Sequence, residues 1–210
     1  MKTRILLVLP LMLVLSGCGT SRILTSTEPQ QTIYTLRALQ PHPDAPESAG
    51  PARVVEIALP ILAPGLDTDR IALLHADGQK LDYYAGARWA ESFGSLVQSF
   101  TRRTITAALP HVVAVTPEQH LDADYKLQIK INDLQPVYGS STQSVPVVVA
   151  NIEFTLIRAK SERIVSSFTL SMQQTPTANR QDLIVATMET LLQDIQQDAF
   201  QKIDQSIARR

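Results

Sequence analysis

Apolar and polar residues alternate along the second half of the chain and predict three strands there, over 125–132, 145–157 and 164–172. A period of two buries one face of a strand and leaves the other face in water. Shorter apolar runs predict further strands, and Asp77-Gly78 lies between two of them as a typical hairpin turn. These further strands are expected over 32–36, 53–59, 71–74, 79–84 and 112–115.

Apolar residues spaced three and four positions apart predict two helices, over 88–109 and 179–210. Trp89 lies on the apolar stripe of the first helix, so we expect it in the core. Asn179 can cap the second helix. The stripe of that second helix runs as far as Ile207. Its first half fits a core position, whereas its last turns fit either the core or a contact with another subunit.

About five main strands and two helices predict an α/β fold with a mixed sheet and helices on one or both of its faces. The segment 40–51 holds four prolines and is expected to be a loop. The length of 32–210 suits one hydrophobic core, so this part is expected to form a single domain.

The N-terminus has the pattern of an export signal. Lys2 and Arg4 precede an apolar run over 5–15, and Leu15-Ser16-Gly17 leads to Cys18. This order predicts a signal peptide over 1–17. The run is too short for a membrane-spanning helix, which needs roughly 20 apolar residues. The four residues that end at Cys18 resemble the lipobox of bacterial lipoproteins, which implies a diacylglycerol on the thiol and an acylated amine.

Cleavage before Cys18 has three consequences for the mature chain. Cys18 is the only cysteine, so no disulfide is expected. The segment 18–31 is polar and weakly patterned, and we interpret it as a lipidated tether to a periplasmic domain. Gly19 stands where aspartate would favour retention at the inner membrane, so the expected location is the periplasmic face of the outer membrane.

The search for chemistry in the sequence finds no catalytic constellation. The net charge is −1, which argues against a nucleic-acid partner. The four histidines lack a metal-ligand spacing, and no glycine-rich phosphate loop is present. Asp67 and Asp69 are the best metal candidates, but their loop lacks the other ligands of a calcium loop. Turn chemistry and a local Asp–Arg pair explain them better. No enzyme activity, metal or cofactor is expected.

Two segments of the sequence resemble a known family. They are Gly-Leu-Asp-Thr-Asp-Arg-Ile over 65–71 and Leu-Asp-Tyr-Tyr-Ala-Gly-Ala-Arg-Trp-Ala-Glu over 81–91. Both resemble the signature of the ABC-type transport auxiliary lipoproteins, the PqiC-like group. The resemblance implies a three-layer α/β fold with a mixed sheet of about five strands, similar to the N-terminal domain of TolB. It implies no enzyme activity.

The resemblance also implies partners. Members of the family work beside a permease, an ATPase and an MCE-type periplasmic protein in lipid transport, and assembly as a homo-oligomer fits the group as well. The loop 65–71 and the hairpin 71–84 are the most specific matches. They therefore give the candidate partner-contact residues, which are Leu66, Asp67, Arg70 and Tyr84.

Two functions stay open at this point. The first is a membrane-anchored adaptor for an MCE assembly, which a filled core and an exposed apolar patch would favour. The second is a stand-alone lipid-binding or envelope-structural lipoprotein, which a large apolar cavity would favour.

Overall fold

The computed structural model describes residues 31–38, 52–76 and 80–208. The expected signal peptide, Cys18, most of the tether, the proline-rich loop and the Asp77-Gly78 turn lie outside these residues, so they stay predictions.

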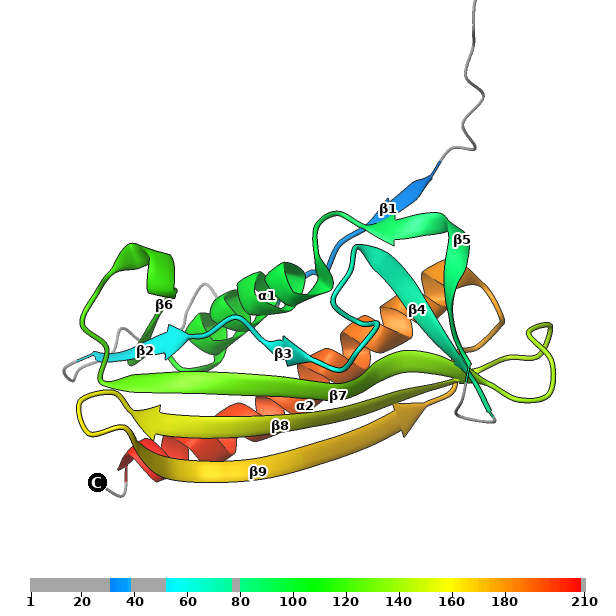
Figure 1. Ribbon diagram of the computed structural model, residues 1–210. Helices are drawn as coiled ribbons and strands as arrows, with labels where there is room; N and C mark the ends of the chain where they lie inside the picture. The colour runs from blue at the N-terminus through cyan, green and yellow to red at the C-terminus, as the bar shows by residue number, and fades with distance from the viewer. Residues whose placement is uncertain (1–30, 39–51, 77–79, 209–210) are drawn as a thin grey trace, which may run out of the picture. The chain divides into compact units, whose positions relative to one another are not determined.

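The sheet is built on β7 (Tyr125–Tyr138), its longest strand. One edge of β7 pairs with β8 (Val147–Arg158) in antiparallel register, and β8 pairs in the same way with β9 (Arg163–Gln174). Figure 1 shows these three strands side by side. All three strands were predicted from alternation. β7 continues past the predicted end because a register shift between Ile131 and Asp133 lets the strand run on through Pro136.

The other edge of β7 receives three shorter parallel strands in succession, and two more partners widen the sheet on that side. The three are β2 (Arg53–Ile57), β3 (Ile61–Leu62) and β4 (Arg70–His75). β2 also pairs in parallel with β6 (Val112–Val115). β4 forms an antiparallel hairpin with β5 (Leu81–Trp89), and β5 pairs in parallel with β1 (Thr32–Tyr34).

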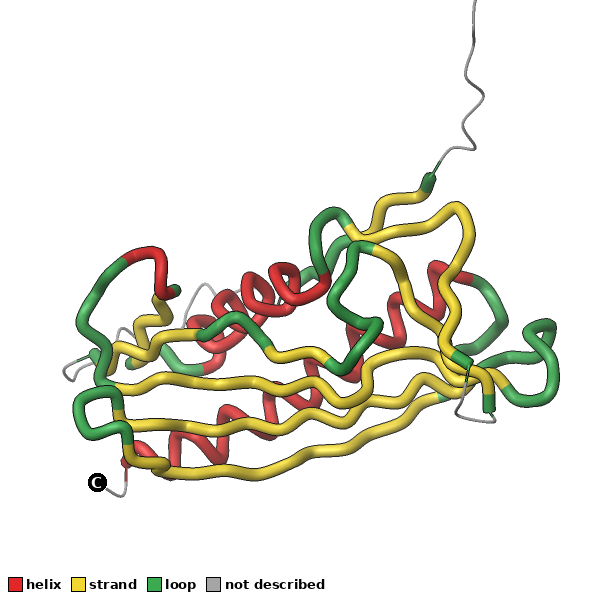
Figure 2. The backbone as a smooth tube through the Cα atoms, in the orientation of Figure 1, coloured by secondary structure: helices red, strands yellow, loops and turns green. Residues whose placement is uncertain are grey.

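Two long helices, α1 (Phe93–Ala108) and α2 (Gln181–Ala208), cover one face of the sheet (Figures 1 and 2). A short 3₁₀ helix, η1 (Pro117–Gln119), follows β6. The predicted α/β class with a mixed sheet and two main helices is therefore confirmed. The sheet of the described residues has nine strands, more than the expected five or so, because the short strands beside β7 also pair into it.

The core lies between the helices and the inner face of the sheet. Every second residue of β8 is buried there, as the alternation predicted, and the large side chain of Phe154 is fully enclosed. α2 contributes a buried stripe that reaches Ile207. The last turns of α2 therefore pack in the core, which was one of the two positions left open for them by the sequence.

The first helix begins five residues later than predicted. Residues 88 and 89 end β5, because Trp89 pairs with Tyr34 of β1 and its amide donates to the Asp69 carbonyl at 2.7 Å. Ser92 then caps α1 by accepting the Ser95 amide. Trp89 continues the apolar spacing of the helix, but the pairing of residues 88 and 89 with β1 gives them the conformation of a strand. Trp89 is nevertheless buried, as expected.

The segment after β1, residues 35–38, crosses both helices as a strap in which Leu36 and Ala38 are buried and Thr35 and Arg37 are exposed. Its Leu36 side chain is 2% exposed. Arg103 of α1 donates to the Leu36 carbonyl, and Gln193 of α2 donates to the Arg37 carbonyl. Glu189 accepts the Arg37 amide at 2.9 Å. The segment that follows the predicted tether is thus part of the folded core.

Candidate functional site

The two signature segments meet in space. The loop between β3 and β4 is bonded along its length to the β5 end and the α1 start. Tyr83 Oη donates to the Gly65 carbonyl at 3.1 Å, and the Phe93 amide donates to the Thr68 carbonyl at 3.0 Å. Gly65 has φ +86°, and a side chain there would collide with Leu81. The two signature segments therefore depend on each other for their conformation.

Leu66, one of the four candidate contact residues, is not at the surface. Its side chain is 5% exposed and belongs to the core. Its expected role as a contact residue is corrected for that reason, since a buried side chain presents no area to a partner. Asp67, the next residue, is exposed.

Asp67 lies beside the exposed side chain of Leu59, and Ile61 is a second exposed apolar residue two positions further along the chain. The side chains of Asp67 and Leu59 both approach within 4 Å of the position that a Cβ on Gly94 of α1 would occupy. Leu59 is 58% exposed, and Ile61, two residues on, is 55% exposed. We call these three residues, Leu59, Ile61 and Asp67, the docking corner.

Arg70 and Arg88 lie opposite each other as register partners of β4 and β5. The Arg70 guanidinium stacks 3.9 Å from the centre of the Tyr83 ring. Arg88 Nη1 donates to Asp69 Oδ2 at 3.3 Å. Asp69 therefore pairs with an arginine of the second signature segment. The local Asp–Arg pair expected within the loop is not found, because none of the ion pairs between described residues joins Asp67 or Asp69 to Arg70.

Tyr84 is half-buried and lies at the head of a chain of hydrogen bonds. Its hydroxyl lies 2.7 Å from the Tyr138 hydroxyl, which donates to Asn179 Oδ1 at 2.8 Å. Burial, followed by the bond to Tyr138, raises the pKa of Tyr84 well above its usual value. Asn179 also donates to the Thr142 carbonyl, so its side chain connects both β7, through Tyr138, and the loop between β7 and β8 to the residues before α2.

A polar hollow of about 340 Å³ opens beside residues 84–88 of β5. We call it the arginine hollow; its walls are Gln31, Asp69, Arg70, Tyr84 and residues 85–88. It brings together two of the predicted contact residues, Arg70 and Tyr84, but neither Leu66 nor Asp67. Arg88 belonged to the second signature segment, but only the strand pairing reveals that it joins this group.

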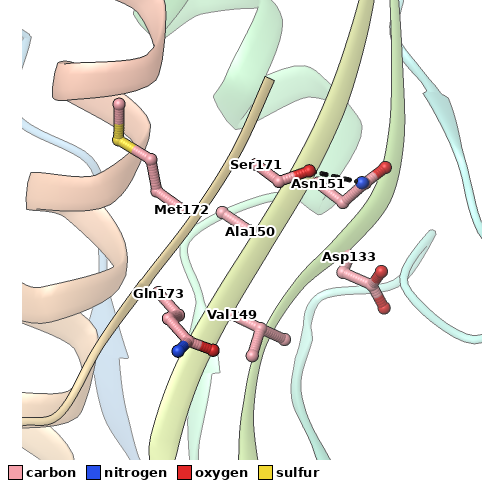
Figure 3. Close-up of a pocket in the computed structure, with 7 residues that line it drawn as sticks. All are labelled: Asp133, Val149, Ala150, Asn151, Ser171, Met172 and Gln173. Atoms are coloured by element: carbon pink, nitrogen blue, oxygen red, sulfur yellow. Dashed lines mark hydrogen bonds between the residues drawn. The ribbon is translucent and has the colours of Figure 1, made fainter. Parts of the chain in front are cut away.

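A second hollow lies on the open face of the sheet, across β7, β8 and β9 (Figure 3). In its wall, Asn151 donates to Ser171 at 2.7 Å and accepts a bond at 2.8 Å from Asn132, which is not one of the lining residues. The Met172 side chain points away from this row, toward the helices (Figure 3). Asp133 accepts a bond from Gln135. The groups in this hollow are largely paired already, so it is a weaker candidate.

Two further searches concern only the described residues. No group of three or more His, Cys, Asp or Glu side chains converges there as a metal site would require. The helices of this part of the chain are not long and apolar enough to cross a membrane.

The fold is shared with solved structures of low sequence identity. The crystal structure of protein XCC0632 from Xanthomonas campestris matches 85% of this chain and 98% of its own, with 20% identity and a TM-score of 0.70. The hypothetical protein CT253 from Chlamydia trachomatis matches 76% of this chain and 99% of its own, with 8% identity and a TM-score of 0.52. No curated protein matches the sequence.

The sequence itself matches a family model over most of its length. The model describes the ABC-type transport auxiliary lipoprotein component, and the match covers residues 34–199. It includes both signature segments and extends into the second half of α2. The chain therefore belongs to the family of ABC-type transport auxiliary lipoprotein components.

Proposed function

We propose that this protein is a non-enzymatic adaptor, anchored in the outer membrane, that connects the membrane to the MCE-type component of an ABC lipid transporter. The observation that carries the proposal is the family match over residues 34–199, joined to the exposed docking corner beside the interlocked signature segments. Family members are auxiliary components of transporters, so a docking surface is what the function requires.

The anchor is the lipid that the lipobox predicts on Cys18, and Gly19 directs the protein to the outer membrane. The docking corner then works at the membrane surface, on the periplasmic side. Tethering raises the effective concentration of the domain near a partner that reaches the same membrane, so a modest contact is sufficient.

The interior of the fold supports an adaptor over a lipid-carrying protein. Side chains of the sheet and both helices form one hydrophobic cluster, in which Ile152 and Phe154 of β8 are fully buried. The hollows of the open face and of β5 lie at the surface, and each holds about 340 Å³. Leu59 and Ile61, by contrast, present apolar area to the solvent.

Cross-linking in living cells, followed by recovery of the tagged full-length protein, tests the adaptor role. We expect the wild type to recover an MCE-type protein and its permease or ATPase. The matched variant Cys18→Ser, which cannot be lipidated, should recover much less. Failure to recover any transport component with the wild type would contradict the adaptor role, whatever lipid copurifies with the protein.

A further inference from the structure

The arginine hollow contains an electrostatic conflict that the fold does not resolve. Arg70 and Arg88 are directly opposite in the β4–β5 pairing. The Cβ atoms of such residues lie about 4.5–5.5 Å apart, and like charges in this position destabilise a sheet. A surface chosen for stability alone would place a carboxylate or a neutral residue at one of the two positions.

Asp69 compensates only one of the two arginines. Its carboxylate pairs with Arg88 at 3.3 Å, and none of the ion pairs between described residues includes Arg70. The Arg70 guanidinium carbon instead lies 3.9 Å from the centre of the Tyr83 ring. This contact adds no negative charge. Within the part of the chain that the structure describes, the positive charge of Arg70 therefore has no carboxylate partner.

A hydrogen-bond donor is also unused. Arg88 Nε is buried and has no partner among the described residues. Buried donors without a partner are rare in folded proteins, so this one indicates a missing acceptor. The positive charge of Arg70 and the unpaired donor of Arg88 together favour an anion as that acceptor.

The shape of the strand makes room for that anion. Between the register pairs Arg70–Arg88 and Ala72–Tyr83, β5 contains more residues than β4 and departs from regular pairing. Gly86 lies in this departure with φ +69°, and the position of its absent Cβ faces open space. The resulting hollow of about 340 Å³ is at the small end of ligand sites and suits a compact polar group.

We propose that the arginine hollow binds a phosphate group, and that the group is the phosphate diester of a membrane phospholipid headgroup. Arginine is the side chain best suited to phosphate, because its planar donors form two parallel bonds to the oxygens. Arg70 supplies a positive charge that no described carboxylate balances. Arg88 supplies a second guanidinium in the wall, and its buried Nε must turn toward the hollow to reach the phosphate. The two signature segments each contribute one of these arginines.

The position of the hollow favours a lipid over free phosphate as the source. Gln31 lies in its wall, at the point where the predicted tether from Cys18 enters the domain. A tether of this length spans at most about 50 Å when fully extended. It therefore keeps the domain near the bilayer that holds the anchor and lets the hollow approach its headgroups. This choice of source rests on the proposed anchoring, whereas the phosphate site itself does not.

Binding to the mature lipidated protein in neutral detergent tests the proposal without any transport partner. Dihexanoyl phosphatidylglycerol is titrated in one arm and inorganic phosphate in the other, and the arginine Nε–Hε resonances report binding. We expect saturable shifts with the phospholipid and at least tenfold weaker binding by Arg70→Gln. The matched control is Arg158→Gln, since Arg158 also stacks on a tyrosine, Tyr125, but lies on β8.

A second variant should change the phospholipid affinity in the opposite direction. Asp69→Asn removes the compensating carboxylate and should tighten phospholipid binding, so a fold defect and a loss of charge are distinguished. Unchanged affinity in both Arg70→Gln and Asp69→Asn would overturn the phosphate site. Inorganic phosphate that binds as tightly as the phospholipid would overturn the assignment to a lipid headgroup.

Discussion

The hydroxyl of Tyr84 lies 2.7 Å from the hydroxyl of Tyr138 and acts as the donor of that bond, because Tyr138 uses its own proton on Asn179. The chain of bonds runs from β5, through the end of β7, to the residues that precede α2. It attaches the hairpin of the signature segments to the body of the sheet. The position of the arginine hollow depends on this attachment, because Tyr84 is also one of its walls.

Replacement Tyr84→Phe removes the first bond of this chain and should lower the free energy of unfolding by about 0.5–1.5 kcal/mol at pH 7. The raised pKa of Tyr84 makes this difference pH-dependent. The folded protein keeps the hydroxyl protonated, whereas the unfolded chain loses its proton near pH 10. Stability from this group is therefore present below about pH 10 and is lost as the pH rises further.

Urea unfolding of the wild type and Tyr84→Phe at pH 7 and near pH 11 measures the effect. The gap between the two proteins should shrink at the higher pH, since only the wild type carries the titrating hydroxyl. A gap that stays constant or widens would show that the folded environment does not hold the proton as described.

A buried hydrogen bond joins the two helices. Gln196 of α2 donates to Thr101 Oγ1 of α1 at 2.6 Å, and both side chains are fully buried. Thr101→Val takes away the acceptor and leaves the amide unpaired, so we expect a loss of about 1–3 kcal/mol in unfolding free energy. The control Thr104→Val removes only a bond within α1. If both variants lost the same amount in denaturant unfolding, the inter-helix bond would have no special weight.

The pattern of the sequence predicted the strands of the sheet better than the start of the first helix. Alternation along β8 reports directly which side chains face the helices, so its burial was predictable from the sequence. The boundary at Phe93 was not, because Trp89 fits a helical stripe equally well. Its conformation is decided by β1 and by the Asp69 carbonyl, which are distant in the sequence.

Leu36→Ala should destabilise the domain by about 2–5 kcal/mol, because the side chain fills a fully enclosed position between the helices. Ile33→Ala is the matched control, since Ile33 is exposed on β1 only three residues earlier. Thermal unfolding of the two variants should show a large decrease in Tm for the first and little change for the second. Equal Tm values would contradict the account of Leu36 as a core residue that attaches this strap to the helices.

Within the signature loop, Leu66 and Asp67 should behave differently. Leu66→Ala should lower the unfolding free energy by about 2–5 kcal/mol, because it opens a cavity in the core. Asp67→Ala changes an exposed side chain and should stay within about 0.5 kcal/mol of the wild type. Chemical denaturation measures both values. A stability loss of similar size in both variants would show that Asp67 supports the fold and does not serve as a free contact residue.

The candidate site was only partly predictable, for a physical reason that its residues illustrate. The sequence identified Arg70 and Tyr84 through the signature, and both line the arginine hollow. It also selected Leu66, whose burial depends on how the loop folds back. Arg88 escaped selection as a site residue because its partner, Arg70, is set by the register of β4 and β5 and not by spacing along the chain.

The most direct test of the adaptor role is photo-cross-linking from the docking corner in living cells. A photoreactive amino acid replaces Ile61 in one strain and Ile164 in another, since Ile164 is 63% exposed but lies on β9. Both proteins keep Cys18 and the full chain. The account predicts adducts with an MCE-type transport protein from position 61 and far fewer from position 164. Adducts from position 164 alone, or none from position 61, would contradict docking through this corner.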